Sequence, residues 1–242
     1  MAVELLSLVI RSSSPTVLAQ FWAQALRWDV SELVSAHVAL IPPDPTSFRF
    51  EFRSGADAKV DQNPIHFDLT SASTDDQNSS VAALVLNGAR PADVGQVGDE
   101  GHVVLADLEG NEFCVIEPGN QFLASCPRLG AVNCDGTKEL GYFFSAILGW
   151  PLVWDKDEET AIQSPTGDGP KITWSGPPLK PKSRRERIHF HVRPAAGTST
   201  DAAVTELLRL GATHSDDGRQ ECADTVRLVD VDGNELCLAA AS

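Results

Sequence analysis

The sequence lacks long apolar stretches, paired cysteine motifs and an excess of positive charge. No apolar run approaches the roughly 20 residues that a transmembrane helix needs, so we expect no membrane partner. The first residues carry neither a basic segment nor a small-residue cleavage site, which argues against a signal peptide. The five cysteines show no CxxC spacing, so the sequence predicts reduced thiols and cytoplasmic localisation rather than a disulfide scaffold or a zinc knuckle.

Positive charge is scarce: acidic residues outnumber basic ones by 34 to 19, and the formal net charge is −15. The phosphates of a nucleic acid would be repelled over most of such a surface, so we expect no nucleic-acid partner. A cationic or neutral small molecule is compatible with this charge, although acidity that serves solubility alone explains it equally well. The one basic cluster, residues 180–187, is either a solvated loop or the anion-facing lip of a cavity.

Common catalytic signatures are missing too: there is no Ser-His-Asp ordering, no P-loop and no Gly-rich dinucleotide fingerprint. The chain instead repeats itself at an offset of 123 residues. His66 in segment 63–69 recurs as His189 in segment 186–192, and segment 107–114 (DLEGNEFC) recurs as segment 230–237 (DVDGNELC). The pair Gly88 and Ala89 recurs at 211–212. These blocks indicate a duplication, with one domain at 1–121 and a second at 122–242.

Each half reads as two units of strand, helix and further strands. In the first unit, strands are predicted at 5–11, 37–41 and 47–53, with a helix at 16–28. The second unit predicts a strand at 64–70, a helix at 74–86 ending before Gly88, and a hairpin at 102–107 and 111–117. The third and fourth units start at Leu129 and Arg187. The predicted fold class is α+β: two tandem domains, each of two βαβββ units that form a curled mixed sheet with helices on the outside.

Alternation along the strands separates an apolar face from a polar one. In segment 65–69, Ile65, Phe67 and Leu69 point to one face, while His66 and Asp68 point to the other. The second copy and the two hairpin strands alternate in the same way, so a curled sheet would gather polar side chains in a cavity. The candidate ligand-binding residues are His66, Asp68, Glu112, His189, His191 and Glu235.

These features resemble the vicinal oxygen chelate superfamily, which includes glyoxalase I, bleomycin-resistance proteins, fosfomycin-resistance enzymes and extradiol dioxygenases. The resemblance covers essentially the whole chain as two tandem domains. It rests on the repeated units, the strand histidines and the Asp-x-x-Gly-Asn-Glu-x-Cys hairpins. It also rests on the helix motifs 21–22 (FW) and 142–144 (YFF), which precede 26–28 (LRW) and 148–150 (LGW). The amino-acid sequence of the hairpins is most similar to that of the glyoxalase-like subgroup.

The resemblance implies a place for a divalent metal, because metal enzymes of the superfamily hold an ion with side chains from four strands. The first-strand position falls on Ser7 in the first domain and on or beside Gly130 in the second, and neither residue is a normal ligand. Glu51 has Ser175 as its counterpart, and cysteines stand where the metal enzymes have glutamate. The candidate ligands for Zn, Ni, Fe or Mn are therefore His66, Glu51, Cys114, His189 and Cys237. The alternative is that the histidines are hydrogen-bonded wall residues and the cysteines are small buried apolar residues.

Two functions follow from the resemblance and remain open at this point. The first is a protein that binds a small molecule in sheet-lined cavities without a complete catalytic metal site, which the acidic balance and the incomplete ligand sets favour. The second is a divalent-metal-dependent lyase, isomerase or dioxygenase that acts on a small molecule with vicinal oxygens. Since two domains of one chain can pair with each other, a monomer is sufficient, with a dimer as the alternative.

Overall fold

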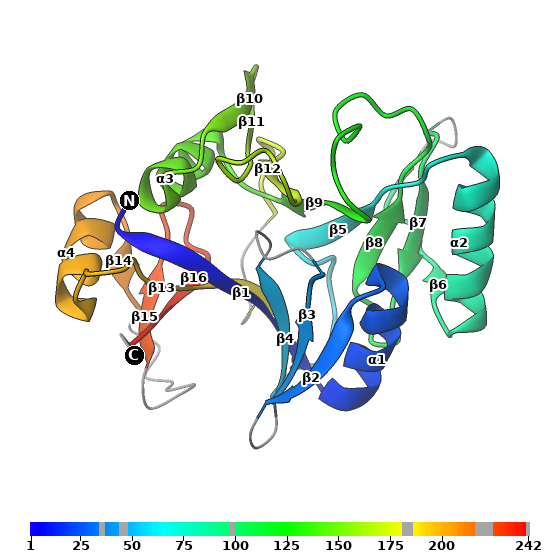
Figure 1. The fold of residues 1–242 in the computed structure, drawn as a ribbon, viewed down its shortest axis with the longest axis horizontal. Helices are drawn as coiled ribbons and strands as arrows, with labels where there is room; N and C mark the ends of the chain where they lie inside the picture. Colours follow the sequence, from blue (N-terminus) through cyan, green and yellow to red (C-terminus); the bar gives the residue numbers. More distant parts are fainter. Residues whose placement is uncertain (34–36, 44–47, 97–99, 181–185, 216–224, 241–242) are drawn as a thin grey trace.

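Four units of one strand, one helix and three further strands make up the chain (Figure 1). The computed structural model describes residues 1–33, 37–43, 48–96, 100–180, 186–215 and 225–240. Unit 1 contains β1 (Val3–Ser12), α1 (Pro15–Leu26), β2 (Asp29–Leu33), β3 (His37–Ile41) and β4 (Arg49–Ser54). Unit 2 contains β5 (Ile65–Leu69), α2 (Thr74–Leu86), β6 (Arg90–Pro91), β7 (Val103–Ala106) and β8 (Glu112–Val115).

The second half of the chain repeats this order. Unit 3 contains β9 (Leu129–Cys134), α3 (Lys138–Leu148), β10 (Leu152–Lys156), β11 (Glu159–Ile162) and β12 (Lys171–Trp174). Unit 4 contains β13 (Ile188–Pro194), α4 (Thr200–Arg209), β14 (Thr213–His214), β15 (Thr225–Val229) and β16 (Glu235–Ala239). The predicted fold class, with its four βαβββ units, is confirmed.

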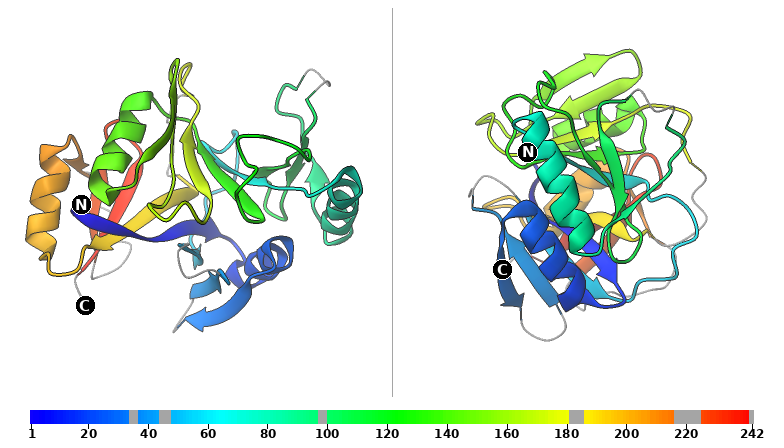
Figure 2. Two further views of the ribbon diagram at one scale, coloured as in Figure 1. Left: turned by 45° about the horizontal axis from the view of Figure 1, so that its top comes forward. Right: turned by 90° about the vertical axis from the view of Figure 1, so that its right-hand side faces the viewer.

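Each of the two sheets combines one unit from each half of the chain. The first sheet, sheet A, has the order β14-β15-β16-β13-β1-β4-β3-β2 and joins units 1 and 4. The second, sheet B, has the order β10-β11-β12-β9-β5-β8-β7-β6 and joins units 2 and 3. The joints are antiparallel pairs between first strands, β1 with β13 and β5 with β9. The sequence repeat therefore does not coincide with a sheet: each repeat supplies half of both sheets, as the two orientations in Figure 2 show.

Local sequence explains where the helices begin and end. The hydroxyl of Ser73 accepts a hydrogen bond from the Asp76 N–H at 3.1 Å, which caps α2, and both ends of that helix lie where the sequence predicts them. Helix α3 ends at the C-cap Gly149, whose φ of +68° is a left-handed conformation that glycine adopts without strain. Each helix covers the strands of its own unit, and α3 also contacts β1 of sheet A.

The apolar faces of both sheets share one core. Trp22 of α1 packs edge-to-face on Phe67 of sheet B, with ring centroids 5.0 Å apart. Phe50 of sheet A lies 4.9 Å from the same Phe67 ring, so aromatic contacts join the two sheets directly. Phe67 lies in this core between Ile65 and Leu69, which confirms the predicted apolar side of the strand.

Four cysteines, Cys114, Cys126, Cys134 and Cys237, are free thiols, while Cys222 lies outside the described residues. Residues 181–185 of the basic cluster also lie outside them. Within the described part of the chain, no helix is both long and apolar enough to span a membrane.

Candidate functional site

The polar face of sheet B brings together side chains from four neighbouring strands. Asp68 on β5 lies opposite Cys114 on β8, and Asn133 on β9 lies opposite Thr173 on β12. The antiparallel pair of β5 and β9 sets His66 opposite Asn133. Because side chains alternate along each strand, all of these residues point away from the shared core. The centre of sheet B therefore carries a carboxyl, an amide, a hydroxyl, a thiol and an imidazole on one face.

A cavity of about 340 Å³ opens over this face. Its volume lies within the range of roughly 300–1,000 Å³ that is typical of small-molecule pockets. Its lining residues come from the polar face, from segment 116–123 and from the β10–β11 hairpin; they are Asp68, Ile116, Asn120, Phe122, Leu123, Asn133, Trp154, Glu159, Thr160, Thr173, Trp174 and Ser175. A second cavity of about 240 Å³ includes His66 and shares Asn133 and Ser175 with the first.

Asp68 is the buried ionisable group of this face, with 8% of its surface exposed. Burial raises the pKa of Asp68, although the nearby His66 imidazole, the Cys114 thiol and the Asn133 amide all favour the charged carboxylate. The distance from His66 Nε2 to Asp68 Oδ1 is 3.6 Å. Burial and the Asp68 carboxylate both raise the pKa of Cys114, so this thiol keeps its proton at neutral pH.

Asn133 and Thr173 were not predicted from the sequence. Thr173 Oγ1 is buried and has no hydrogen-bond partner among the described residues, which marks it as a group that a guest could satisfy. The sequence placed the counterpart of Glu51 at Ser175, and this is wrong. Glu51 lies opposite Val9 on β1, and the matching pair on sheet B is Thr173 opposite Asn133.

A shorter connection explains that error. There are 42 positions from Val9 to Glu51 but only 40 from Asn133 to Thr173, so carrying the first spacing over to Asn133 gives Ser175, two residues beyond Thr173. The sequence nevertheless contained an indication that Asn133 belongs to the polar face, because it is the polar residue of a strand that is otherwise largely apolar.

The polar face of sheet A is organised around arginines. Glu51 has 2% of its surface exposed and forms ion pairs with Arg49 at 2.6 Å and with Arg53 at 2.5 Å. Burial alone would raise the pKa of Glu51, but the Arg53 and Arg49 guanidiniums outweigh it and lower that pKa to about 2. Arg53 Nη2 also lies 3.2 Å from His191 Nδ1. Burial, reinforced by these guanidiniums, lowers the pKa of His191 to about 4, so His191 is neutral at pH 7.

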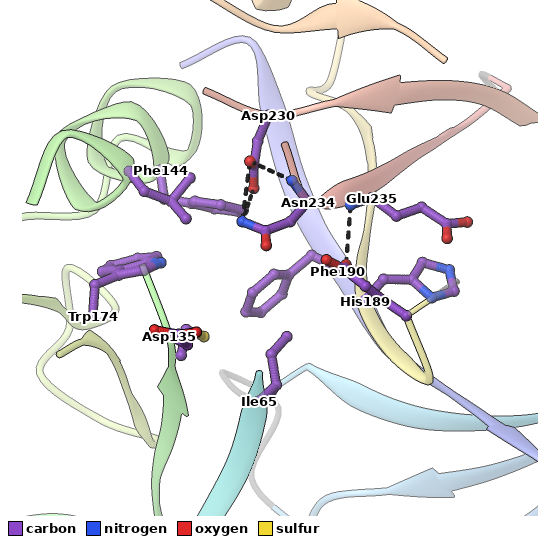
Figure 3. A pocket seen from close by; sticks show the side chains of 12 residues that line it. Ile65, Asp135, Phe144, Trp174, His189, Phe190, Asp230, Asn234 and Glu235 are labelled. Atoms are coloured by element: carbon purple, nitrogen blue, oxygen red, sulfur yellow. Dashed lines mark hydrogen bonds between the residues drawn. The ribbon is translucent and has the colours of Figure 1, made fainter. Parts of the chain in front are cut away.

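A second ion-pair cluster on sheet A joins residues of β1, β15 and β16. Glu235 Oε1 is 2.5 Å from Arg11 Nη2 and 3.4 Å from Arg227 Nη2. The Cys237 thiol donates to the same Glu235 oxygen at 3.8 Å. The cavity beside His189 and Glu235 has a volume of about 10 Å³, which holds about one water molecule. Figure 3 shows this narrow space, with Ile65, Phe144, Trp174 and Phe190 surrounding it.

The structure separates some residues that the sequence had grouped together. Glu51 does not meet His66, because β4 belongs to sheet A and β5 to sheet B. Glu112 accepts a hydrogen bond from Lys59 Nζ at 2.5 Å and another from the Asn63 N–H at 3.2 Å, and it lines neither cavity of sheet B. The imidazole of His191 contacts the guanidinium of Arg53, which belongs to the other repeat.

Within the part of the chain that the structure describes, two clusters have donor atoms close enough together to hold a metal ion. His66, Asp68 and Cys114 form one, and His189, Glu235 and Cys237 form the other; within each, the potential ligand atoms lie within 4.8 Å of one another. The sheet B cluster fits a divalent ion, because imidazole, carboxylate and thiolate are all zinc ligands and the set leaves an open position. The sheet A cluster does not fit, because the guanidiniums of Arg11 and Arg227 already neutralise Glu235 and would repel a cation.

Comparisons with known proteins agree with this architecture. The family model described as "Glyoxalase-like domain" matches residues 7–116 and 131–239. The crystal structure of glyoxalase I from Zea mays superposes with a TM-score of 0.63 at 16% identity, covering 99% of this chain and 92% of that chain. A putative dioxygenase from Bacillus subtilis subsp. subtilis str. 168 superposes with a TM-score of 0.57 at 11% identity, covering 98% of this chain and 85% of that chain. No curated protein matches the sequence. At such low identity these structures establish the fold alone.

Proposed function

Because this chain belongs to the glyoxalase-like domain family, we propose that it binds a small organic molecule in the 340 Å³ cavity on sheet B and needs no bound metal to do so. The observation that carries this proposal is the composition of the cavity. Ile116, Phe122 and Leu123 supply an apolar wall, and the face opposite offers Asp68, Asn133 and Thr173. An apolar enclosure with a few converging polar groups is the usual form of a small-molecule site.

The hydrogen-bonding capacity of the cavity supports binding through direct contacts. Thr173 lines the cavity, and its buried Oγ1 has no described partner; a guest that draws this hydroxyl into the cavity by rotation of the side chain removes a desolvation cost of about 1–3 kcal/mol. Trp154 and Phe122 lie edge-to-face, with ring centroids 5.8 Å apart, and form a corner against which a ring can pack. Together these groups suit a guest of one or two rings with at least one polar substituent.

Sheet A makes no matching contribution to the proposed binding. Its carboxylates Glu51 and Glu235 are each held by two arginines, and the cavity beside His189 is too small for an organic molecule. The two sheets therefore have different roles in this proposal: sheet B binds the ligand, and the ion pairs of sheet A hold that sheet together.

A metal-dependent enzyme is the second candidate, and the His66, Asp68 and Cys114 cluster favours it. A divalent ion held by these residues would supply Lewis-acid stabilisation of an oxyanion on a substrate with vicinal oxygens. The chain's own part would be to position that substrate against Asn133 and Thr173 and to keep water out with the wall around Phe122. The first proposal differs from this one in a measurable way, because it requires no metal.

The test is ligand binding with and without metal. A panel of one- and two-ring polar compounds is screened by thermal shift and by tryptophan fluorescence, first in EDTA and then with Zn²⁺, Ni²⁺, Mn²⁺ or Fe²⁺ added. We expect compounds that bind in EDTA and whose fluorescence response is lost in Trp154→Phe. Stoichiometric metal in the purified protein, lost in His66→Ala, together with binding that requires the metal, would overturn the metal-free proposal.

Two threonines on adjacent strands provide a matched control. Thr173→Val removes the hydroxyl that lines the cavity, and we expect affinity to fall about fivefold to tenfold, the effect of one hydrogen bond of about 1 kcal/mol. The hydroxyl of Thr160 instead faces α3, where a Cβ built on Gly141 would lie 2.0 Å from Thr160 Oγ1. Thr160 also borders the cavity, but because its hydroxyl is turned toward α3, we expect Thr160→Val to remove a buried hydroxyl of the same kind with little change in affinity. Equal effects of the two substitutions would place the ligand elsewhere.

A further inference from the structure

We infer that the sheet B cavity selects small organic cations, such as protonated aromatic amines, over neutral and anionic molecules of the same shape. The inference rests on the proposed function, because it names the chemical class of the guest in that same cavity. It depends on three features of the cavity: the charges of its lining residues, the partners of Asp68 and the aromatic rings at its rim.

The ionisable side chains that line the cavity are both acidic. Asp68 lies on the floor and Glu159 lies on the β11 strand, and neither lysine nor arginine is among the lining residues. Lys171 on β12 does not line the cavity, because its Nζ is held at Phe122: it donates to the Phe122 carbonyl oxygen and lies 4.2 Å from the centre of the Phe122 ring. An anion entering the cavity would therefore meet two carboxylates, with no lysine or arginine among the lining residues to compensate for them.

Asp68 differs from the other buried acids on the two polar faces. Glu51 and Glu235 each form ion pairs with two arginines. No described lysine or arginine forms an ion pair with Asp68; the His66 imidazole lies beside it, with Nε2 3.6 Å from Asp68 Oδ1. A buried carboxylate without a permanent positive partner is costly, and a protonated amine at the cavity floor would supply that partner through a charge-assisted hydrogen bond.

The aromatic rings at the rim favour the same class of guest. Trp154 lies on the edge strand β10 with 40% of its surface exposed, and its ring meets Phe122 at an interplanar angle of 78°. Two rings set at such an angle present one π-face and one edge to the same space, and the π-face of tryptophan is the most favourable for a cation. The side-chain carbonyls of Asn120 and Asn133 can accept the remaining N–H groups of an ammonium.

The experiment compares three probes that share a phenyl ring and a two-carbon linker: 2-phenylethylamine, 2-phenylethanol and 3-phenylpropanoate. Affinities are measured by isothermal titration calorimetry at pH 7.5 with the full-length protein in EDTA. We expect the amine to bind at least about tenfold more tightly than the alcohol, which corresponds to the roughly 1.4 kcal/mol expected of one charge-assisted contact, and the carboxylate to bind weakest. Asp68→Asn should reduce the advantage of the amine to less than about twofold and leave the affinity for the alcohol nearly unchanged.

A surface variant controls for the overall negative charge of the protein. Asp75 lies exposed in the first turn of α2, and Asp75→Asn removes one charge of the same sign from a residue that does not line the cavity. This variant should keep the preference for the amine. Equal affinities for amine and alcohol in the wild-type protein, or a preference that survives in Asp68→Asn, would overturn the inference. If the alcohol still binds in a manner sensitive to Trp154→Phe, the proposed function stands without the inference; if no compound of the wider panel binds, both fail.

Discussion

Asp232 caps the first turn of α3: its carboxylate accepts hydrogen bonds from the backbone N–H of Thr137 at 2.6 Å and from the Thr137 hydroxyl at 2.9 Å. Glu109, which precedes Asp232 by 123 residues, does the same for α1, where it accepts from Ser12 Oγ at 2.7 Å and from the Ser14 N–H at 3.0 Å. Each contact joins a hairpin of one sheet to a helix whose unit belongs to the other sheet. Both copies of the repeat therefore keep this contact, and the pair of contacts ties the two sheets to each other.

These caps predict a cost in stability when either carboxylate is removed. A carboxylate at a helix N-terminus satisfies free N–H groups and interacts favourably with the helix dipole. We expect Glu109→Ala and Asp232→Ala each to lower the free energy of unfolding by about 1–2 kcal/mol in urea titrations. Asp168→Ala, at an exposed position, changes the net charge in the same way and should have an effect within about 0.5 kcal/mol of zero. A cap variant as stable as this control would contradict the prediction.

The ion pairs around Glu51 predict a loss of stability in acid. The pKa of Glu51 is lowered to about 2, so the unfolded state takes up a proton at higher pH than the folded state does. The stabilisation is complete above about pH 4.5 and is lost as the pH falls toward 2. Glu51→Gln should cost about 3–5 kcal/mol at pH 7, because it leaves two guanidiniums without their carboxylate. Measured from pH 7 to pH 2, the gap between variant and wild type should narrow only below about 4.5.

His191 contributes a separate acid-sensitive step at higher pH. Because the folded-state pKa is lowered to about 4 from 6.5, the unfolded state binds the additional proton between these two values, and stability falls as the pH decreases through that window. His191→Gln should flatten the stability profile between pH 6.5 and 4 while leaving the step that belongs to Glu51 below 4.5. If the free energy of unfolding depends on pH in the same way in the wild type and in His191→Gln within this window, His191 does not titrate there.

Part of this architecture can be read from the sequence, and part depends on contacts that no local pattern encodes. The cap at Ser73 and the glycine after α2 fix the ends of that helix, and alternation fixes which side of β5 faces the core. The pairing of β1 with β13 joins residues from 178 (Ile10 and Ile188) to 191 (Val3 and Pro194) positions apart, so it depends on which apolar faces pack together. The spacing Arg49-x-Glu51-x-Arg53 does place three charges on one side of a strand, which is the pattern of an ion-pair network as much as that of a metal ligand.

The crossed assembly of the sheets makes a prediction about the isolated repeat. Residues 1–121 contain units 1 and 2, which belong to different sheets and lack their partner strands β13 and β9. We expect this fragment on its own to give no cooperative unfolding transition as a monomer, because the joining edges of β1 and β5 would be exposed. Mixing it with residues 122–242 should restore the near-ultraviolet circular dichroism of the intact chain. A cooperatively folded monomer of 1–121 by light scattering would show that the repeat can close on itself.

The close contact between α3 and β11 predicts that a helix-favouring substitution will destabilise the protein. Gly141 lies in the middle of α3, where alanine would ordinarily stabilise a helix by about 1 kcal/mol. A Cβ at this position would lie 2.0 Å from Thr160 Oγ1, 2.7 Å from Thr160 Cβ and 3.0 Å from a ring carbon of Trp174, so helix and strand must move apart. We expect Gly141→Ala to cost about 1–3 kcal/mol in urea titrations, the usual range for overpacking.

The matched variant is Gly141→Ala combined with Thr160→Gly, which removes the two closest atoms. After the effect of Thr160→Gly alone is subtracted, the double variant should recover most of the free energy of unfolding that Gly141→Ala removes. The remaining contact, with Trp174 at 3.0 Å, can be relieved by a small shift. A purely additive double variant would show that the helix tolerates the alanine without pushing on β11.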